Sequence, residues 1–103
     1  MKINLIEKSR IEDVDFTNLT FGKIFSDHMF ISEHKNGKWS SGEIRPYKNI
    51  SVSPSARVLH YGQAIFEGMK CFKSEDDDLF LFRPEENFKR FNKSSQRLAI
   101  PEI

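Results

Sequence analysis

An amphipathic helix that begins at Pro84 is the feature that most constrains how this chain can fold. Pro84 suits a first helical position, and Glu85 and Glu86 suit the positive end of a helix dipole. The apolar side chains that follow share one face of the helix: Phe88, Phe91 and Leu98. The pattern predicts a helix from Pro84 to about Ile100, with an apolar stripe that another layer must cover.

The rest of the chain favours short strands and turns. Asn36 and Gly37 form the pair that favours a tight type I′ turn, which predicts a hairpin with its second arm near residues 39–48. The acidic loop 74–78 lies before strand-like residues 79–83 and predicts another hairpin. Residues 49–58 predict a short strand ended by Pro54, whereas residues 1–20 have no sustained period and predict an irregular arm. The fold class expected is α+β, with a mostly antiparallel sheet packed with helices.

The composition indicates a globular chain without a strong field. It has 103 residues, 38% of them hydrophobic with ten phenylalanines, which predicts one domain or part of one and a packed interior. Sixteen basic and fifteen acidic side chains give a net charge of +1, so we expect neither nucleic acid nor a membrane as partner. A sheet with one clear helix leaves a face to be covered, so we expect a part of a longer protein.

Metal and membrane signals are weak. One cysteine makes no internal disulfide, and the three histidines lack the spacing of a zinc site, so no metal is expected. No stretch of the sequence resembles a signal peptide or approaches a membrane span, which favours a cytoplasmic protein.

Residues 59–72 hold the side chains that first suggest catalysis. His60 and Glu67 lack a visible partner in the sequence, so a hydrogen-bonded structural role is favoured for both. Cys71 lies in an apolar run without an activating cation, which favours a small buried hydrophobe.

The helix that begins at Pro84 allows two interpretations of its basic residues. They alternate with aromatic residues, which suits either a solvated face or, less commonly, a nucleic-acid interface: Lys89, Arg90, Lys93 and Arg97. Arg90 lies between Phe88 and Phe91, where a rigidly held guanidinium is suited to bind a phosphate through two parallel hydrogen bonds. Residue types and spacing alone therefore lead to an α+β domain with one candidate anion-binding arginine.

Three ordered blocks resemble a known family. "FGKIFSDHMF", "LHYGQAIFEGMK" and "LFRPEENFKRFNKSSQRLAIP" together resemble the amino-terminal domain of branched-chain amino acid aminotransferases, which are pyridoxal-phosphate enzymes of fold type IV. The resemblance runs from about Phe21 to Pro101. It implies the small α+β domain over residues 21–103, after the irregular arm expected over 1–20 from the residues alone, with the larger lysine-bearing domain absent.

The resemblance implies roles for four residues. Arg90 matches the arginine that binds the phosphate of pyridoxal 5′-phosphate, in agreement with the clamped guanidinium expected from the residues alone. Phe21 and Phe66 match aromatic residues of the substrate side-chain pocket. Tyr61 matches a tyrosine that one subunit of the family's homodimer presents to the neighbouring active site.

The resemblance also implies a reaction that this chain does not complete. The family exchanges amino groups between leucine, isoleucine or valine and 2-oxoglutarate, and its cofactor-binding lysine lies in the second domain. Neither Lys70 nor Lys89 occupies that lysine's motif, so no catalytic residue is assigned and the chain alone is predicted to be inactive. Two alternatives stay open: another fold type IV enzyme, and a basic-helix module that binds RNA or protein.

Overall fold

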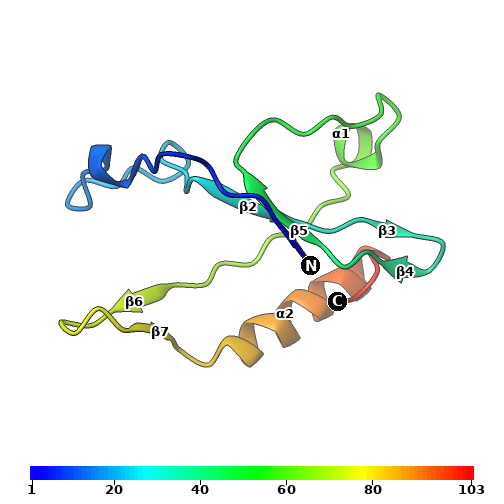
Figure 1. The fold of residues 1–103 in the computed structure, drawn as a ribbon. Coiled ribbons are helices and arrows are strands. Elements are labelled where there is room, and N and C mark those ends of the chain that lie inside the picture. The colour runs from blue at the N-terminus through cyan, green and yellow to red at the C-terminus, as the bar shows by residue number, and fades with distance from the viewer. The chain divides into compact units, whose positions relative to one another are not determined.

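The computed structural model describes residues 1–103, which form short strands and helices of the α+β class (Figure 1). The chain divides into two compact units, Met1–Ser51 and Val52–Ile103, and each is described by itself. The division expected from the sequence, an arm over residues 1–20 before a domain over 21–103, stays a prediction.

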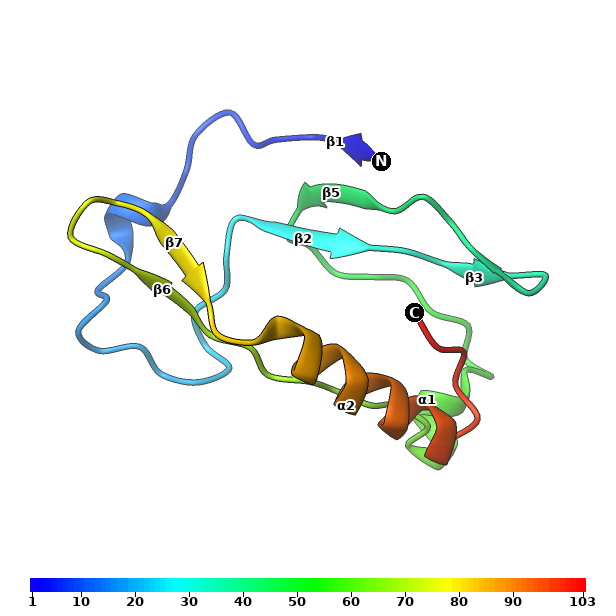
Figure 2. The ribbon, with the colours of Figure 1, turned by 90° about the horizontal axis from the view of Figure 1, so that it is seen from below.

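The first unit contains a three-stranded sheet. Its strands lie in the order β1 (Lys2–Ile3), β5 (Glu43–Pro46) and β2 (His28–Ile31), with β1 parallel and β2 antiparallel to β5 (Figure 2). Pro46 lies at the end of the central strand, beyond the two residues that pair with β1, so its missing N–H interrupts no ladder. The residues expected to form an irregular arm therefore contribute one short strand.

The Asn36–Gly37 hairpin is confirmed. Strand β3 (His34–Lys35) pairs with β4 (Lys38–Trp39), and the two turn residues have φ of 52° and 75°. Both central positions of a type I′ turn need positive φ, which Asn and Gly adopt at low cost. The His34 and Trp39 rings meet edge to face at 5.1 Å across the hairpin.

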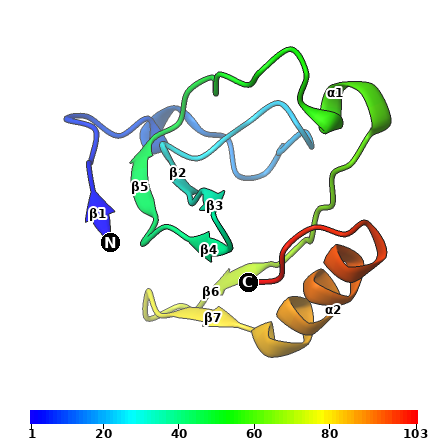
Figure 3. The same ribbon diagram turned by 90° about the vertical axis from the view of Figure 1, so that its right-hand side faces the viewer.

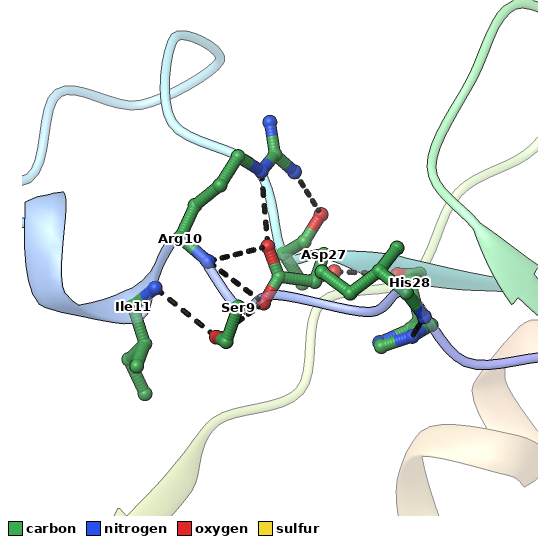
Figure 4. A network of polar contacts seen from close by, with 7 residues as sticks. Ser9, Arg10, Ile11, Asp27 and His28 are labelled. Atoms are coloured by element: carbon green, nitrogen blue, oxygen red, sulfur yellow. Dashed lines mark hydrogen bonds and ion pairs between the residues drawn. The ribbon is translucent and has the colours of Figure 1, made fainter.

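A polar network fastens the irregular segment before β2 to that strand's start (Figure 4). The Asp27 carboxylate accepts hydrogen bonds from Ser9 Oγ at 2.6 Å and Arg10 Nε at 2.9 Å. The His28 ring accepts the backbone N–H of Ile6 at 3.1 Å. A short 3-10 helix, η1 (Ile11–Asp13), follows the network directly. Side chains thus hold in place a segment that has few ladder hydrogen bonds of its own.

The second unit contains two helices and one hairpin: α1 (Arg57–Tyr61), β6 (Cys71–Lys73), β7 (Leu79–Leu81) and α2 (Pro84–Arg97). The hairpin around the acidic loop and the helix from Pro84 are both confirmed. Figure 3 shows the β6–β7 hairpin at the amino-terminal end of α2. Helix α2 ends at Arg97, and the backbone N–H groups of Leu98 and Ile100 still donate to Ser95 O at 3.1 and 2.9 Å.

The prediction of a short strand before Pro54 is wrong. Residues 47–56 form no strand, and the chain turns at Ser53, whose carbonyl accepts the Ala56 N–H at 2.9 Å. A short apolar run becomes a strand only where a neighbouring strand supplies hydrogen-bond partners. None pairs with this segment, and the turn leads into α1 instead.

The expectation of a packed apolar interior is also wrong for this chain by itself. No hydrophobic side chain is buried, and the only buried polar one is Ser95. The chain exposes 9417 Å². Two separate folded units, each of half its 12.1 kDa mass, would together expose about 7300 Å². Strands of two to four residues and helices of five and fourteen are too few to cover one another's apolar faces.

No helix of the chain is both long enough and apolar enough to span a membrane.

Candidate functional site

Arg90, on α2, is held by a carboxylate that comes from outside the helix. Its Nε donates to Glu67 Oε2 at 2.7 Å, and its Nη2 donates to Glu67 Oε1. Two parallel hydrogen bonds between a guanidinium and a carboxylate fix the plane of the guanidinium. The sequence predicts rigidity from the flanking phenylalanines, but Phe88 is 48% exposed and the rigidity comes from Glu67 instead.

Asn87 and a backbone amide hold the carboxylate itself. Asn87 Nδ2 donates to Glu67 Oε1 at 3.1 Å and to Gly68 O at 2.9 Å, and the Gly68 N–H donates to Glu67 Oε1 at 3.1 Å. Asn87 and Arg90 are three residues apart, so they share one helix face. We call these four residues, Glu67, Gly68, Asn87 and Arg90, the carboxylate clamp.

The electrostatics of the clamp keep both partners charged. The hydrogen bonds from Arg90 lower the pKa of Glu67 to about 2, against the opposing effect of its partial burial. Glu67 in turn raises the pKa of Arg90. The side chain of Glu67 is 12% exposed, so the structure confirms the hydrogen-bonded role expected for it.

One end of the Arg90 guanidinium stays open, which is the property a phosphate ligand needs. The bonds to Glu67 use two of its five N–H donors and leave the Nη1 end without a partner in the chain. The side chain is 67% exposed. A phosphate can therefore reach the remaining donors, and Arg90 fits the phosphate of pyridoxal 5′-phosphate as one ligand of a larger set.

The other basic residues of α2 differ from Arg90. Lys89 Nζ lies 2.7 Å from Glu86 Oε1, and this ion pair raises the pKa of Lys89. A nucleophilic lysine needs a lowered pKa, so the raised pKa of Lys89 does not suit that role. Because Lys89 and Arg90 are both paired with carboxylates, the helix offers a less basic face for nucleic acid than its sequence indicates.

The three aromatic residues expected in the substrate pocket are strongly exposed. Phe21 is 100%, Tyr61 83% and Phe66 88% exposed. Phe21 belongs to the first unit, and Tyr61 and Phe66 belong to the second. Phe66 directly precedes Glu67 and has the opposite exposure, so an aromatic side chain extends outward next to the clamp. Their roles in binding substrate stay predictions.

The structure confirms the prediction for His60 and contradicts the prediction for Cys71. The ring nitrogen Nε2 of His60 lies 2.6 Å from Pro54 O, so its expected structural role is confirmed. Cys71 was expected to be buried and is exposed, because every residue of β6 and β7 is exposed and nothing in this unit covers the hairpin. No cluster of His, Cys, Asp and Glu side chains is arranged to hold a metal ion.

The first unit has a hollow of about 480 Å³, which is lined mainly by apolar side chains. Arg10, Asp27 and His28 also line it, and the first two bind each other in the network of Figure 4. The hydrogen bond from Ser9 and then those from Arg10 lower the pKa of Asp27. The Asp27 carboxylate therefore has its partners within the first unit.

Comparison with known proteins relates this chain to aminotransferases. It is 49% identical over 90 residues to branched-chain-amino-acid aminotransferase 2 of Bacillus subtilis, across 86% of this chain and 25% of that protein. It is 48% identical over 86 residues to the cytosolic branched-chain-amino-acid aminotransferase of Saccharomyces cerevisiae, across 82% of this chain and 23% of the relative. A probable branched-chain-amino-acid aminotransferase of Staphylococcus aureus is 44% identical over 104 residues, across 100% of this chain and 28% of the relative. No family model matches the chain.

These similarities relate the chain to one segment of aminotransferase sequences. The relatives that it matches are named branched-chain-amino-acid aminotransferases or transaminases, so the resemblance seen in its three blocks is confirmed. The chain spans about a quarter of the length of the relatives it matches.

Sequence reasoning identified Arg90 but missed the partners that hold it. Glu67 is 23 positions before Arg90, and no local pattern joins residues at that distance. The spacing of Asn87 and Arg90 was the available signal, because it places an amide and a guanidinium on one helix face.

Proposed function

We propose that this chain is the small amino-terminal domain of a branched-chain amino acid aminotransferase of fold type IV. One observation carries the proposal: the chain is 49% identical over 86% of its length to a protein named for this activity. The α+β fold and the open guanidinium of Arg90 agree with it. The proposed substrates are leucine, isoleucine and valine, with 2-oxoglutarate as the exchange partner.

The proposed part of this chain in the reaction is binding and orientation. Arg90 binds the phosphate of pyridoxal 5′-phosphate through the N–H groups that Glu67 leaves open. The bound cofactor supplies the electron sink for amino-group transfer. Phe21 and Phe66 contact the aliphatic side chain of the substrate, and Tyr61 reaches the active site of the second subunit in a homodimer.

We expect the chain to be inactive alone, because proton transfer at the substrate needs a lysine that this chain is not proposed to supply. A cytoplasmic location stays a prediction, since the relatives are named both cytosolic and chloroplastic.

A segment exchange tests the proposal. The matching segment of the Bacillus subtilis protein is replaced by this chain, which gives what we call the exchange enzyme. We expect it to transfer amino groups from all three branched-chain amino acids to 2-oxoglutarate. A folded exchange enzyme that acts on none of them would refute the proposal, and activity only on other amino acids would favour another fold type IV reaction.

Arg90→Ala tests the cofactor role in the exchange enzyme. We expect it to weaken retention of pyridoxal phosphate by about 10- to 100-fold, as expected when hydrogen bonds to a charged group are lost. Arg97→Ala is the matched control, because Arg97 is a basic residue of the same helix that forms no ion pair. Equal retention by the two variants, measured by cofactor absorbance after dialysis, would contradict the assignment.

A further inference from the structure

We infer that Glu67 is a positioning residue for phosphate binding, because it fixes one edge of Arg90 and thereby directs the other toward the anion. This inference rests on the proposed function. Nε and Nη2 of Arg90 donate to the two carboxylate oxygens, so the guanidinium plane and the direction of its open end are both set. An arginine without such a partner would rotate among many rotamers and lose entropy on binding.

The support around Glu67 is more extensive than an ordinary surface ion pair has. Its side chain is 12% exposed, whereas Glu86, the carboxylate of the other ion pairs at α2, is 47% exposed. Two further N–H donors, from Asn87 and Gly68, bind the same carboxylate oxygen at 3.1 Å. A carboxylate that is held this firmly can transmit its orientation to the arginine it binds.

The sign of the effect distinguishes positioning from simple electrostatics. The negative charge of Glu67 repels a phosphate, so its removal would strengthen phosphate binding if charge alone mattered. If positioning dominates, its removal weakens phosphate binding, because Arg90 loses its fixed direction. We infer the second case, since the N–H groups of Nη1 are left for the phosphate, whereas the carboxylate binds the edge formed by Nε and Nη2.

The test uses the complete exchange enzyme and two ligands, pyridoxal phosphate and pyridoxal, which differ only in the phosphate. Glu67→Gln keeps the size of the side chain and removes its charge. Glu86→Gln is the matched control, because it removes a carboxylate of α2 that pairs with Arg83 and Lys89 rather than with Arg90. Dissociation constants are measured by fluorescence titration of the cofactor-free enzyme, which does not depend on turnover.

We expect Glu67→Gln to weaken pyridoxal phosphate binding by about 5- to 30-fold, because an arginine that is not held must lose rotamer entropy on binding. Binding of pyridoxal should change less than twofold, and Glu86→Gln should leave both unchanged. In the Arg90→Ala background the Glu67 substitution should have no further effect, because positioning acts only through the arginine.

Several outcomes would overturn the inference. Tighter binding of pyridoxal phosphate by Glu67→Gln means that charge dominates. Equal losses for the two ligands, or an undiminished loss in the Arg90→Ala background, mean that Glu67 only maintains the fold. If Glu67→Gln does not fold, Asn87→Ala replaces it, because this variant removes the hydrogen bond that Asn87 donates to Glu67 and keeps the charge of Glu67. Asn87→Ala should weaken the binding of pyridoxal phosphate, but not of pyridoxal, by less than Glu67→Gln would. An unchanged affinity for pyridoxal phosphate would refute the inference.

The two proposals fail in different ways. If Arg90→Ala loses phosphate-dependent affinity and Glu67→Gln does not, only the positioning role of Glu67 fails. If the folded exchange enzyme shows no preference for pyridoxal phosphate over pyridoxal, the proposed function itself fails.

Discussion

Gly42 should be the glycine of the first unit that least tolerates a side chain. It has φ of 74°, in the left-handed region, and a Cβ atom placed there would overlap the ring of Phe30 on the neighbouring strand. Alanine in this conformation costs about 1–2 kcal/mol. The Phe30 ring must also move, which costs about 0.5–1.5 kcal/mol if it leaves its preferred rotamer. Because Phe30 is 63% exposed, we expect the lower end of that range.

Hydrogen exchange in the exchange enzyme measures this cost locally. Gly42→Ala should accelerate exchange of the backbone amides of β2 and β5 by about 10- to 70-fold, which corresponds to a loss of about 1.5–2.5 kcal/mol. Gly37→Ala is the matched control, since Gly37 also has φ of 75° but nothing lies within 4 Å of a Cβ atom there. The difference between the two variants therefore reports the Phe30 contact.

A further variant isolates the steric part. When Phe30→Ala is combined with Gly42→Ala, the extra acceleration of exchange that Gly42→Ala shows over Gly37→Ala should disappear. Only the acceleration caused by the backbone conformation should remain. If Gly42→Ala accelerates exchange no more than Gly37→Ala does, the close approach of Phe30 does not exist in the enzyme. If neither variant accelerates exchange, the positive φ values assigned to both positions are wrong.

Two further predictions concern other residues. Asp27→Asn should accelerate amide exchange in residues 6–11 by about two- to fivefold, since it removes the charge that binds Arg10, while Asp15→Asn, whose partners lie in its own turn, should not. Folding lowers the pKa of Asp27, so the charged carboxylate stabilises the folded state at pH values above its unfolded pKa. This stabilisation is lost as the pH falls through the folded pKa. Well below that pH, the exchange rates of Asp27→Asn should therefore approach those of the wild type. Phe66→Ala should lower kcat/KM for valine and isoleucine by about 10- to 100-fold and leave the cofactor affinity unchanged. Phe82 is also a strongly exposed phenylalanine, and Phe82→Ala should change neither quantity. If Phe66→Ala lowers only the cofactor affinity, Phe66 does not line the substrate pocket.

Local chemistry explains which elements were predictable. The Asn36–Gly37 turn, the hairpin around the acidic loop and the helix from Pro84 each depend on conformational preferences of a few neighbouring residues. The strand expected before Pro54 failed because a strand depends on a distant partner, and Cys71 was exposed because burial depends on what covers a surface.

The sequence by itself indicated the family to which the chain is related and made Arg90 the candidate phosphate ligand, because motifs and helix position are properties of consecutive residues. Only the tertiary structure decided what holds Arg90, since Glu67 binds it across 23 positions of the chain and Asn87 binds Glu67 across 20. It also decided that these residues alone bury no apolar core. Burial is a sum over all the surfaces that pack together, so a segment with many phenylalanines can expose them until other surfaces cover them.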